Sequence, residues 1–174
     1  GLIASLVGIV MGPYLANRFG KKKVYLTAVI ISTALNLLRL LDVTSMILIY
    51  ISALIGGVAG GWMVPVSTSI QADNTTYVQY KTGKRAEAAI ASLTSFVSKV
   101  AQGLGGAIPG YVIAAYGFVT GASVQPESIN TGIILCALIL PLIFGILGSL
   151  IFGTQYTLDQ KAVIEMDAKI NRNN

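Results

Sequence analysis

The chain has 174 residues, of which 54% are hydrophobic and 11% are charged, and its formal net charge is +5 at pH 7. Because a soluble domain usually contains about 25% charged residues, this composition excludes an ordinary soluble globular protein. The positive charge does not indicate a nucleic-acid partner, since the basic residues lie in short connectors beside apolar runs, where they act as topology signals.

Five apolar runs have, or nearly have, the length of a membrane-spanning helix. Such a helix needs about 20 apolar residues, and the first run is shorter and lacks the charged start and cleavage site of a signal peptide. We therefore expect an all-α, polytopic membrane protein that begins inside a helix, as a fragment would. The predicted spans are residues 1–16, 24–41, 46–70, 88–116 and 131–152.

The end of the chain combines a proline with a polar tail. Pro141 is expected to interrupt the last span, because proline removes a backbone hydrogen bond. Residues 1–153 then form the transmembrane bundle, and residues 154–174 form a tail. Within the tail, Thr157 to Gln160 fit a capping box, which predicts the start of a short surface helix.

Two hydrophilic connectors carry most of the charge. The first is interpreted as a cytoplasmic anchor, in which Gly20 can supply a tight turn between helices. Its basic residues are Arg18, Lys21, Lys22 and Lys23. The second mixes charges with two tyrosines, as expected for a cytoplasmic gate. Its residues are Asp73, Tyr77, Tyr80, Lys81, Lys84, Arg85 and Glu87.

The distribution of lysine and arginine predicts an orientation. Ten basic residues fall on one side of the five-span layout, only Arg39 falls on the other side, and Lys99 lies within a span. Because cytoplasmic connectors are enriched in these residues, we expect both connectors and the C-terminus to lie in the cytoplasm, with the spans in the plasma membrane. The ten residues are Arg18, Lys21, Lys22, Lys23, Lys81, Lys84, Arg85, Lys161, Lys169 and Arg172.

The span at 46–70 joins a small-residue face to a polar half. Its glycines form overlapping small-xxx-small pairs, a pattern that lets membrane helices pack closely, and we assign the packing face to Gly56 and Gly60. The half that begins at Trp62 is rich in serine and threonine. We expect that half to face a cavity.

The span at 88–116 contains a lysine near its centre. Lys99 lies roughly 17 Å beyond Ala88 at 1.5 Å per residue, and a charge at the bilayer centre costs about 2.5–3.5 kcal/mol on insertion scales and marks a functional site by default. A lysine paired only for packing is the alternative. No acidic residue of the chain lies at a similar depth, so a counter-charge is expected from other helices or from a ligand. The polar helix face consists of Ser92, Ser95, Lys99, Gln102 and Gly106.

Two strings of the chain carry a family resemblance: residues 73–87 read DNTTYVQYKTGKRAE, and residues 92–99 read SLTSFVSK. They resemble the glycoside–pentoside–hexuronide:cation symporters, the melibiose-carrier-like branch of the major facilitator superfamily. The resemblance implies that the chain corresponds to helices 8–12 of a twelve-helix fold and that the N-terminal six-helix half is missing. The basic loop departs from the superfamily signature, with Asn17 where aspartate is usual and Pro13 where glycine is usual.

The same resemblance implies a secondary active transporter that carries a sugar or glycoside with sodium or a proton by alternating access. In such carriers the lysine matching Lys99 lies near the coupling-cation site, and a hydroxyl residue one turn earlier matches Ser95. Gly103 and Gly106 would let this helix pack closely. The predicted cation and substrate cavity comprises Lys99, Ser95, Ser92, Gln102 and Trp62.

Alternative functions remain open at this point. The protein could be a related carrier for a non-sugar solute such as a lipid, or a non-transporting membrane receptor or scaffold with the same fold. An enzyme is not expected, because the chain has no histidine and no plausible nucleophile–base pair or metal-ligand cluster. No cofactor or metal site is predicted beyond the coupling ion, and the expected partners are the solute, the cation, the bilayer and the N-terminal half.

Overall fold

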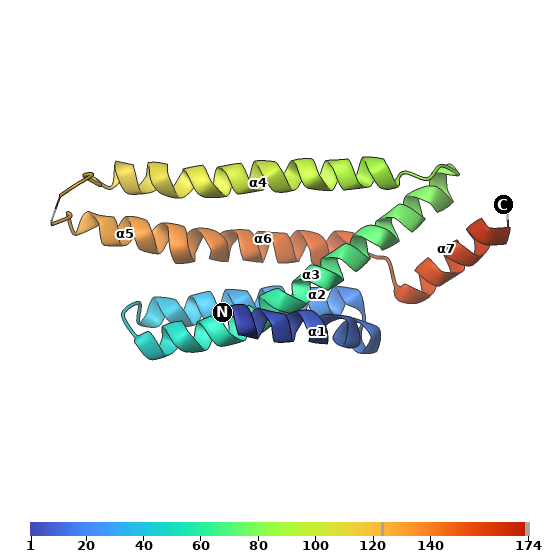
Figure 1. Cartoon of the computed structure of the whole chain (residues 1–174), viewed down its shortest axis with the longest axis horizontal. Helices are drawn as coiled ribbons and strands as arrows, with labels where there is room; N and C mark the ends of the chain where they lie inside the picture. Colours follow the sequence, from blue (N-terminus) through green and yellow to red (C-terminus); the bar gives the residue numbers. More distant parts are fainter. Residues whose placement is uncertain (123, 173–174) are drawn as a thin grey trace.

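The computed structural model describes residues 1–122 and 124–172, and all regular secondary structure in them is helical (Figure 1). This confirms the all-α prediction. The helices are α1 (Leu2–Phe19), α2 (Lys21–Leu41), α3 (Met46–Thr82), α4 (Glu87–Ala115), α5 (Ser128–Ile134), the π-helix η1 (Leu135–Ile139), α6 (Leu140–Gln155) and α7 (Gln160–Arg172).

Within residues 1–122 and 124–172, four helical segments are long and apolar enough to cross a membrane: α1, α2, α3 and the continuous segment from α5 to α6. The protein is therefore a multi-pass membrane protein. Helix α4 has the length of a span, 29 residues, but Lys99, Gln102 and its serines lower its mean hydropathy. It stays a predicted fifth span.

The helices are arranged so that the basic connectors share one end of the molecule. Figure 1 shows the α1–α2 turn, the α3–α4 connector and the start of α7 at one end, and the α2–α3 and α4–α5 connectors at the other. Helix α3 runs diagonally from the layer of α1 and α2 to the N-terminal end of α4. This arrangement is the one that the predicted five-crossing layout requires.

Helix α1 packs on α3 through small residues spaced four apart, since Ala4, Gly8, Gly12 and Ala16 are its buried residues. A β-carbon added at Gly8 would overlap the carbonyl oxygen of Val58 on α3, so only glycine permits this approach. Backbones that approach this closely maximise van der Waals contact, which is the main attraction between helices in lipid.

The face that α3 presents to α1 differs from the predicted one. A β-carbon at Gly61 would overlap the carbonyl oxygen of Ser5, and one at Gly57 would lie 3.0 Å from the Ala4 Cβ. In contrast, Gly60 has no neighbour within 4 Å among the described residues, and Gly56 makes an ordinary 3.5 Å contact with Leu35. The contact with α1 therefore involves Gly57 and Gly61, whereas Gly56 faces α2 and Gly60 faces neither helix.

Helix α3 also continues beyond the predicted membrane span. Residues 73–82, which were expected to form a connector, remain helical, and the helix ends at Gly83, whose φ of 69° is left-handed and whose amide donates to the Gln79 carbonyl oxygen at 2.9 Å. Hydropathy marks where a helix leaves an apolar environment, whereas backbone hydrogen bonding continues until a residue such as glycine ends it. Only residues 83–86 separate α3 from α4.

The last span is interrupted close to Pro141, but by a change from α-helix to π-helix and not by an end of the helix. The helix passes through Pro141, and the five-residue π-helix Leu135–Ile139 lies directly before it. A π-turn absorbs a local break in the α-helical hydrogen-bond ladder. The tail contains the expected helix, α7, but this helix begins at Gln160, whose amide donates to Asp159 Oδ1 at 2.7 Å. The prediction that Thr157 opens the capping box was wrong, because the helix begins later.

Candidate functional site

Three side chains, from α2, from α3 and from the residue after α6, meet at the end of the bundle that carries the basic connectors. Lys21, at the start of α2, donates from Nζ to both carboxylate oxygens of Asp73 on α3, each at 2.7 Å. The hydroxyl of Tyr156, which follows α6, donates to Asp73 Oδ2 at 3.2 Å. Asp73 is 5% exposed and Tyr156 is 9% exposed, so this is a buried polar cluster.

Local sequence explains why these three groups meet. The turn at Gly20, with φ of 88°, places Lys21 at the first position of α2. Asp73 follows Ile70 by three residues, and Ile70 belongs to the buried hydrophobic core, so Asp73 continues the core-facing side of α3. Tyr156 is held by stacking on Phe152, with ring centroids 4.9 Å apart.

The electrostatics of the cluster favour a fixed arrangement. An unpaired buried carboxylate is costly, and both partners of Asp73 reduce that cost. Burial raises the pKa of the Tyr156 hydroxyl, and the neighbouring Asp73 carboxylate raises it further. The tyrosine therefore stays a protonated hydrogen-bond donor at neutral pH.

The structure divides the other predicted gate residues into separate contacts. Arg85 and Glu87 form an exposed ion pair, with Nη2 and Oε1 2.7 Å apart, and this hydrogen bond raises the pKa of the Arg85 guanidinium. Lys81 lies over the Tyr77 ring at 5.9 Å. Lys169 of α7 lies over the Tyr80 ring in the same way, at 5.7 Å. These contacts do not include Asp73, which belongs to the buried cluster instead.

A polar cavity lies where α3, α4 and α7 meet, with a volume of about 570 Å³. Arg85 and Glu87 line it, together with neutral side chains of α3 and the end of α7, which contributes the carboxylate of Asp167. Helix α7 is attached beside this cavity by Lys169, whose Nζ lies 5.7 Å from the centre of the Tyr80 ring. The polar lining of α3 includes Thr68, Gln71, Thr75, Thr76 and Gln79.

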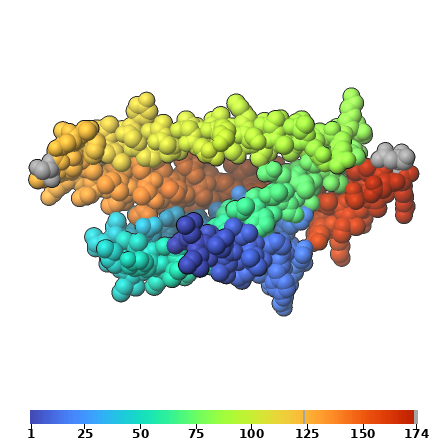
Figure 2. Space-filling view, in the orientation of Figure 1, coloured from blue at the N-terminus to red at the C-terminus, as the bar shows by residue number. Residues whose placement is uncertain are grey.

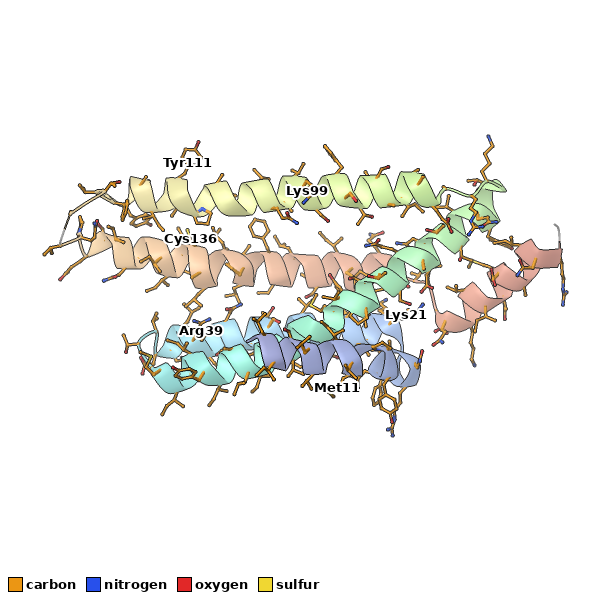
Figure 3. The ribbon with its side chains drawn as sticks, in the orientation of Figure 1. Met11, Lys21, Arg39, Lys99, Tyr111 and Cys136 are labelled. Carbon is orange, nitrogen blue, oxygen red and sulfur yellow. The ribbon has the colours of Figure 1, made fainter. Side chains whose placement is uncertain are left out.

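Lys99 lies midway along α4, as Figure 3 shows. Its Nζ donates to Gln102 Oε1 at 3.4 Å, and neither of the two ion pairs found within residues 1–122 and 124–172 involves it. Among the described residues, the Ser92 hydroxyl donates only to the Ala89 carbonyl oxygen of its own helix. No residue of α4 is buried, and Figure 2 shows this helix as the outermost layer of the molecule. The polar stripe through Ser95 and Lys99 is thus uncovered in the described part of the chain.

Trp62 does not join this stripe, contrary to the prediction. It packs against the hydrophobic core of α1, α2 and α3 and lines an apolar groove with residues of α1 and α2. Its indole Nε1 is buried without a hydrogen-bond partner among the described residues. Gly103 and Gly106 also have open space around them, so their role in packing stays a prediction.

Tyr156 is the residue of the buried cluster that the sequence did not reveal. A tyrosine at the end of an apolar span is typical of an interfacial anchor, and nothing near it in the sequence indicates Asp73, which is 83 residues away. Lys21 and Asp73 were each singled out, but as parts of two different connectors that are 52 residues apart.

Comparisons with known proteins agree with this architecture. Residues 1–160 match the family model described as MFS/sugar transport protein. The chain is 30% identical over 174 residues to the glucuronide carrier protein homolog of Escherichia coli (strain K12), covering 95% of this chain and 38% of that protein.

Two further relatives are similar. The uncharacterized symporter YnaJ of Bacillus subtilis (strain 168) is 31% identical over 169 residues, or 92% of this chain and 35% of that protein. The isoprimeverose transporter of Lactiplantibacillus pentosus is 26% identical over 133 residues, which are 74% of this chain and 27% of that protein. The chain thus spans 27–38% of the length of these three relatives.

Proposed function

The chain belongs to the MFS/sugar transport protein family, and from this premise we propose that it forms helices 8–12 of a twelve-helix secondary carrier. The carrier moves a sugar or glycoside together with sodium or a proton by alternating access between two six-helix halves. The family and the relatives are transporters and not enzymes, in agreement with the sequence prediction. The solute class follows the names of the relatives.

The observation that carries this proposal is the uncovered polar stripe on α4. Lys99 lies at the middle of a helix that is 29 residues long, and its only hydrogen-bond partner in the described residues is Gln102. A charge at that depth in a bilayer needs a counter-charge or a water-filled cavity. Carboxylates of the N-terminal half supply the counter-charge in this proposal, at the repeat interface where such carriers bind their substrates.

Coupling follows from competition for those carboxylates. A sodium ion or proton that occupies them weakens their attraction for the lysine, so that Lys99 responds to whether the cation site is filled. Ser95, one turn earlier on the same face, supplies a hydroxyl oxygen to the cation. Gradient-driven accumulation then depends on the lysine more strongly than downhill movement does.

We place the basic connectors and the C-terminus in the cytoplasm. Within that face, the cluster of Lys21, Asp73 and Tyr156 holds the start of α2 and the end of α6 against α3 as a fixed unit. The exposed pair Arg85–Glu87 and the polar cavity beside it form the part of the gate that changes its contacts between inward-open and outward-open states.

The first test is uptake against a concentration gradient by the full-length carrier in proteoliposomes with an imposed ion gradient. Lys99→Gln should abolish accumulation while some downhill movement survives, and Ser95→Ala should weaken the dependence on the cation more mildly. Lys161→Gln removes the same charge from an exposed position of the tail helix and should accumulate solute normally. Normal accumulation by Lys99→Gln would mean that the lysine serves packing alone.

A further inference from the structure

A groove with two chemically different parts lies between α1 and α2. The apolar part has a volume of about 410 Å³ and is lined mainly by Met11, Leu15 and Trp62. The polar part, of about 220 Å³, lies at the α1–α2 turn beside Lys21, Lys22 and the start of the tail. Phe19 and Lys23 line both parts, so the two parts are adjacent. Figure 3 labels Met11, which lines the apolar part, and Lys21, which lines the polar part.

The polar part carries unneutralised positive charge. Lys21 is occupied by Asp73, but the ammonium groups of Lys22 and Lys23 have no ion-pair or hydrogen-bond partner among residues 1–122 and 124–172. The other carboxylate of this part, Asp159, accepts the Gln160 amide at the start of α7, and with three lysines against two carboxylates the lining keeps a net charge of +1. The site therefore attracts an anion that reaches two lysines.

The position of the groove limits what its occupant can be. Both α1 and α2 are long and apolar enough to span a membrane, so the part at Met11 and Trp62 lies at the depth of acyl chains. The turn that carries the lysines lies at the end of these spans, at the level of lipid headgroups, where basic clusters attract anionic lipids. An occupant of both parts must have an apolar chain joined to an anionic group.

We propose that this groove binds an anionic glycerophospholipid, whose phosphate lies between Lys22 and Lys23 and whose acyl chain lies along Leu15 and Trp62. Lysine is a common phosphate ligand because its ammonium group is a compact charge on a flexible stem. The site is independent of solute transport, and only its assignment to the cytoplasmic leaflet rests on the orientation proposed above.

Trp62 provides the test, because it is the single tryptophan of the 174 residues and lines the apolar part. The experiment uses the purified full-length protein with Trp62 as its only tryptophan, any other being replaced by phenylalanine. Its fluorescence is titrated with phosphatidylglycerol or phosphatidylcholine that carry the same brominated acyl chains, since bromine quenches tryptophan on contact. Half-maximal quenching should require an at least about fivefold lower mole fraction of phosphatidylglycerol, as expected from its charge.

Matched variants and a competitor give the remaining outcomes. Lys22→Gln with Lys23→Gln should remove the preference for phosphatidylglycerol, whereas Lys84→Gln with Lys161→Gln, the same loss of charge at two exposed positions, should retain it. Inorganic phosphate at constant ionic strength should not compete. Equal quenching from both lipids in the parent protein would overturn the proposal, and so would loss of the preference in the Lys84/Lys161 variant. Competition from free phosphate would also overturn it, because the site would then bind phosphate without a lipid.

Discussion

Asp73 is a carboxylate that is almost completely buried, and the two groups that bind it come from distant parts of the chain. The attraction between Lys21 and Asp73 offsets a desolvation cost that neither residue would bear alone. The Lys21 side chain is still 19% exposed, so water screens part of the interaction. The pair therefore acts chiefly to align α2 with α3.

Removing one member of this pair should be more harmful than removing both. Lys21→Met leaves Asp73 buried without its cation and should destabilise the protein by about 3 kcal/mol, the lower part of the range for broken buried pairs. The double variant Lys21→Met with Asp73→Leu should recover most of that loss. The measurement is thermal unfolding of the purified full-length protein in detergent.

Lys22→Met is the matched control, because Lys22 is the next residue and makes no ion pair among the described residues. Its unfolding temperature should stay close to that of the parent. If Lys21→Met and Lys22→Met shift the temperature equally, Asp73 does not depend on Lys21, and the cluster is not a structural unit.

Among the helices, α1 and α3 pack closely on each other, whereas α4 is exposed. Helices α1 and α3 touch through glycines so closely that backbone atoms of one fill the space of a missing side chain on the other. Helix α4 buries none of its residues against the described chain. The first pair is a self-contained packing unit, and the second presents a surface that other helices of the carrier cover in our proposal.

A single methyl group should distinguish the two glycine faces of α3. Gly61→Ala would place a β-carbon against the Ser5 carbonyl oxygen and should cost about 1–3 kcal/mol, as overpacking usually does. Gly60→Ala meets no atom within 4 Å and should be neutral or stabilising by up to about 1 kcal/mol, the helix preference of alanine over glycine.

Thermal unfolding of the two full-length variants in the same detergent checks this prediction. Gly61→Ala should unfold at a lower temperature than the parent. Gly60→Ala should unfold at the same temperature as the parent or at a higher one. The reverse order would assign the close contact to the face of Gly60 and would contradict the packing described here.

For the whole molecule, the shared end of the basic connectors is the feature with the widest consequence. The turn at Gly20, the connector at residues 83–86 and the start of α7 lie together (Figure 1). The enrichment of lysine and arginine there predicts that this end faces the cytoplasm. The orientation decides which leaflet contains the lipid groove and which gate the α3–α4 connector forms.

Labelling of single cysteines in intact cells tests that orientation. In a full-length protein with Cys136 replaced by alanine, Ala122→Cys, in the α4–α5 connector, should react with a membrane-impermeant maleimide from outside. Lys84→Cys, in the α3–α4 connector, should react only after permeabilisation. Both positions are exposed in the structure, so accessibility differs only by the side of the membrane. The opposite pattern would invert the orientation.

Much of the architecture could be predicted from the sequence because it depends on local composition. Apolar runs indicated the helical spans, the cluster of lysines indicated a common basic end, and Lys99 stood out as a charge inside a span. The strings at residues 73–87 and 92–99 indicated the transporter family. Each of these features is a property of one short segment, so no knowledge of its neighbours was needed.

Only the tertiary structure decided which side chains meet. Consecutive residues on a helix differ by about 100° in direction, so the choice between Gly60 and Gly61 at the α1–α3 contact, and the turning of Trp62 toward α1 and α2, depend on how neighbouring helices are placed. The bond from Tyr156 to Asp73 joins residues 83 positions apart. Such contacts arise from the packing of whole helices, which the pattern within any one segment does not contain.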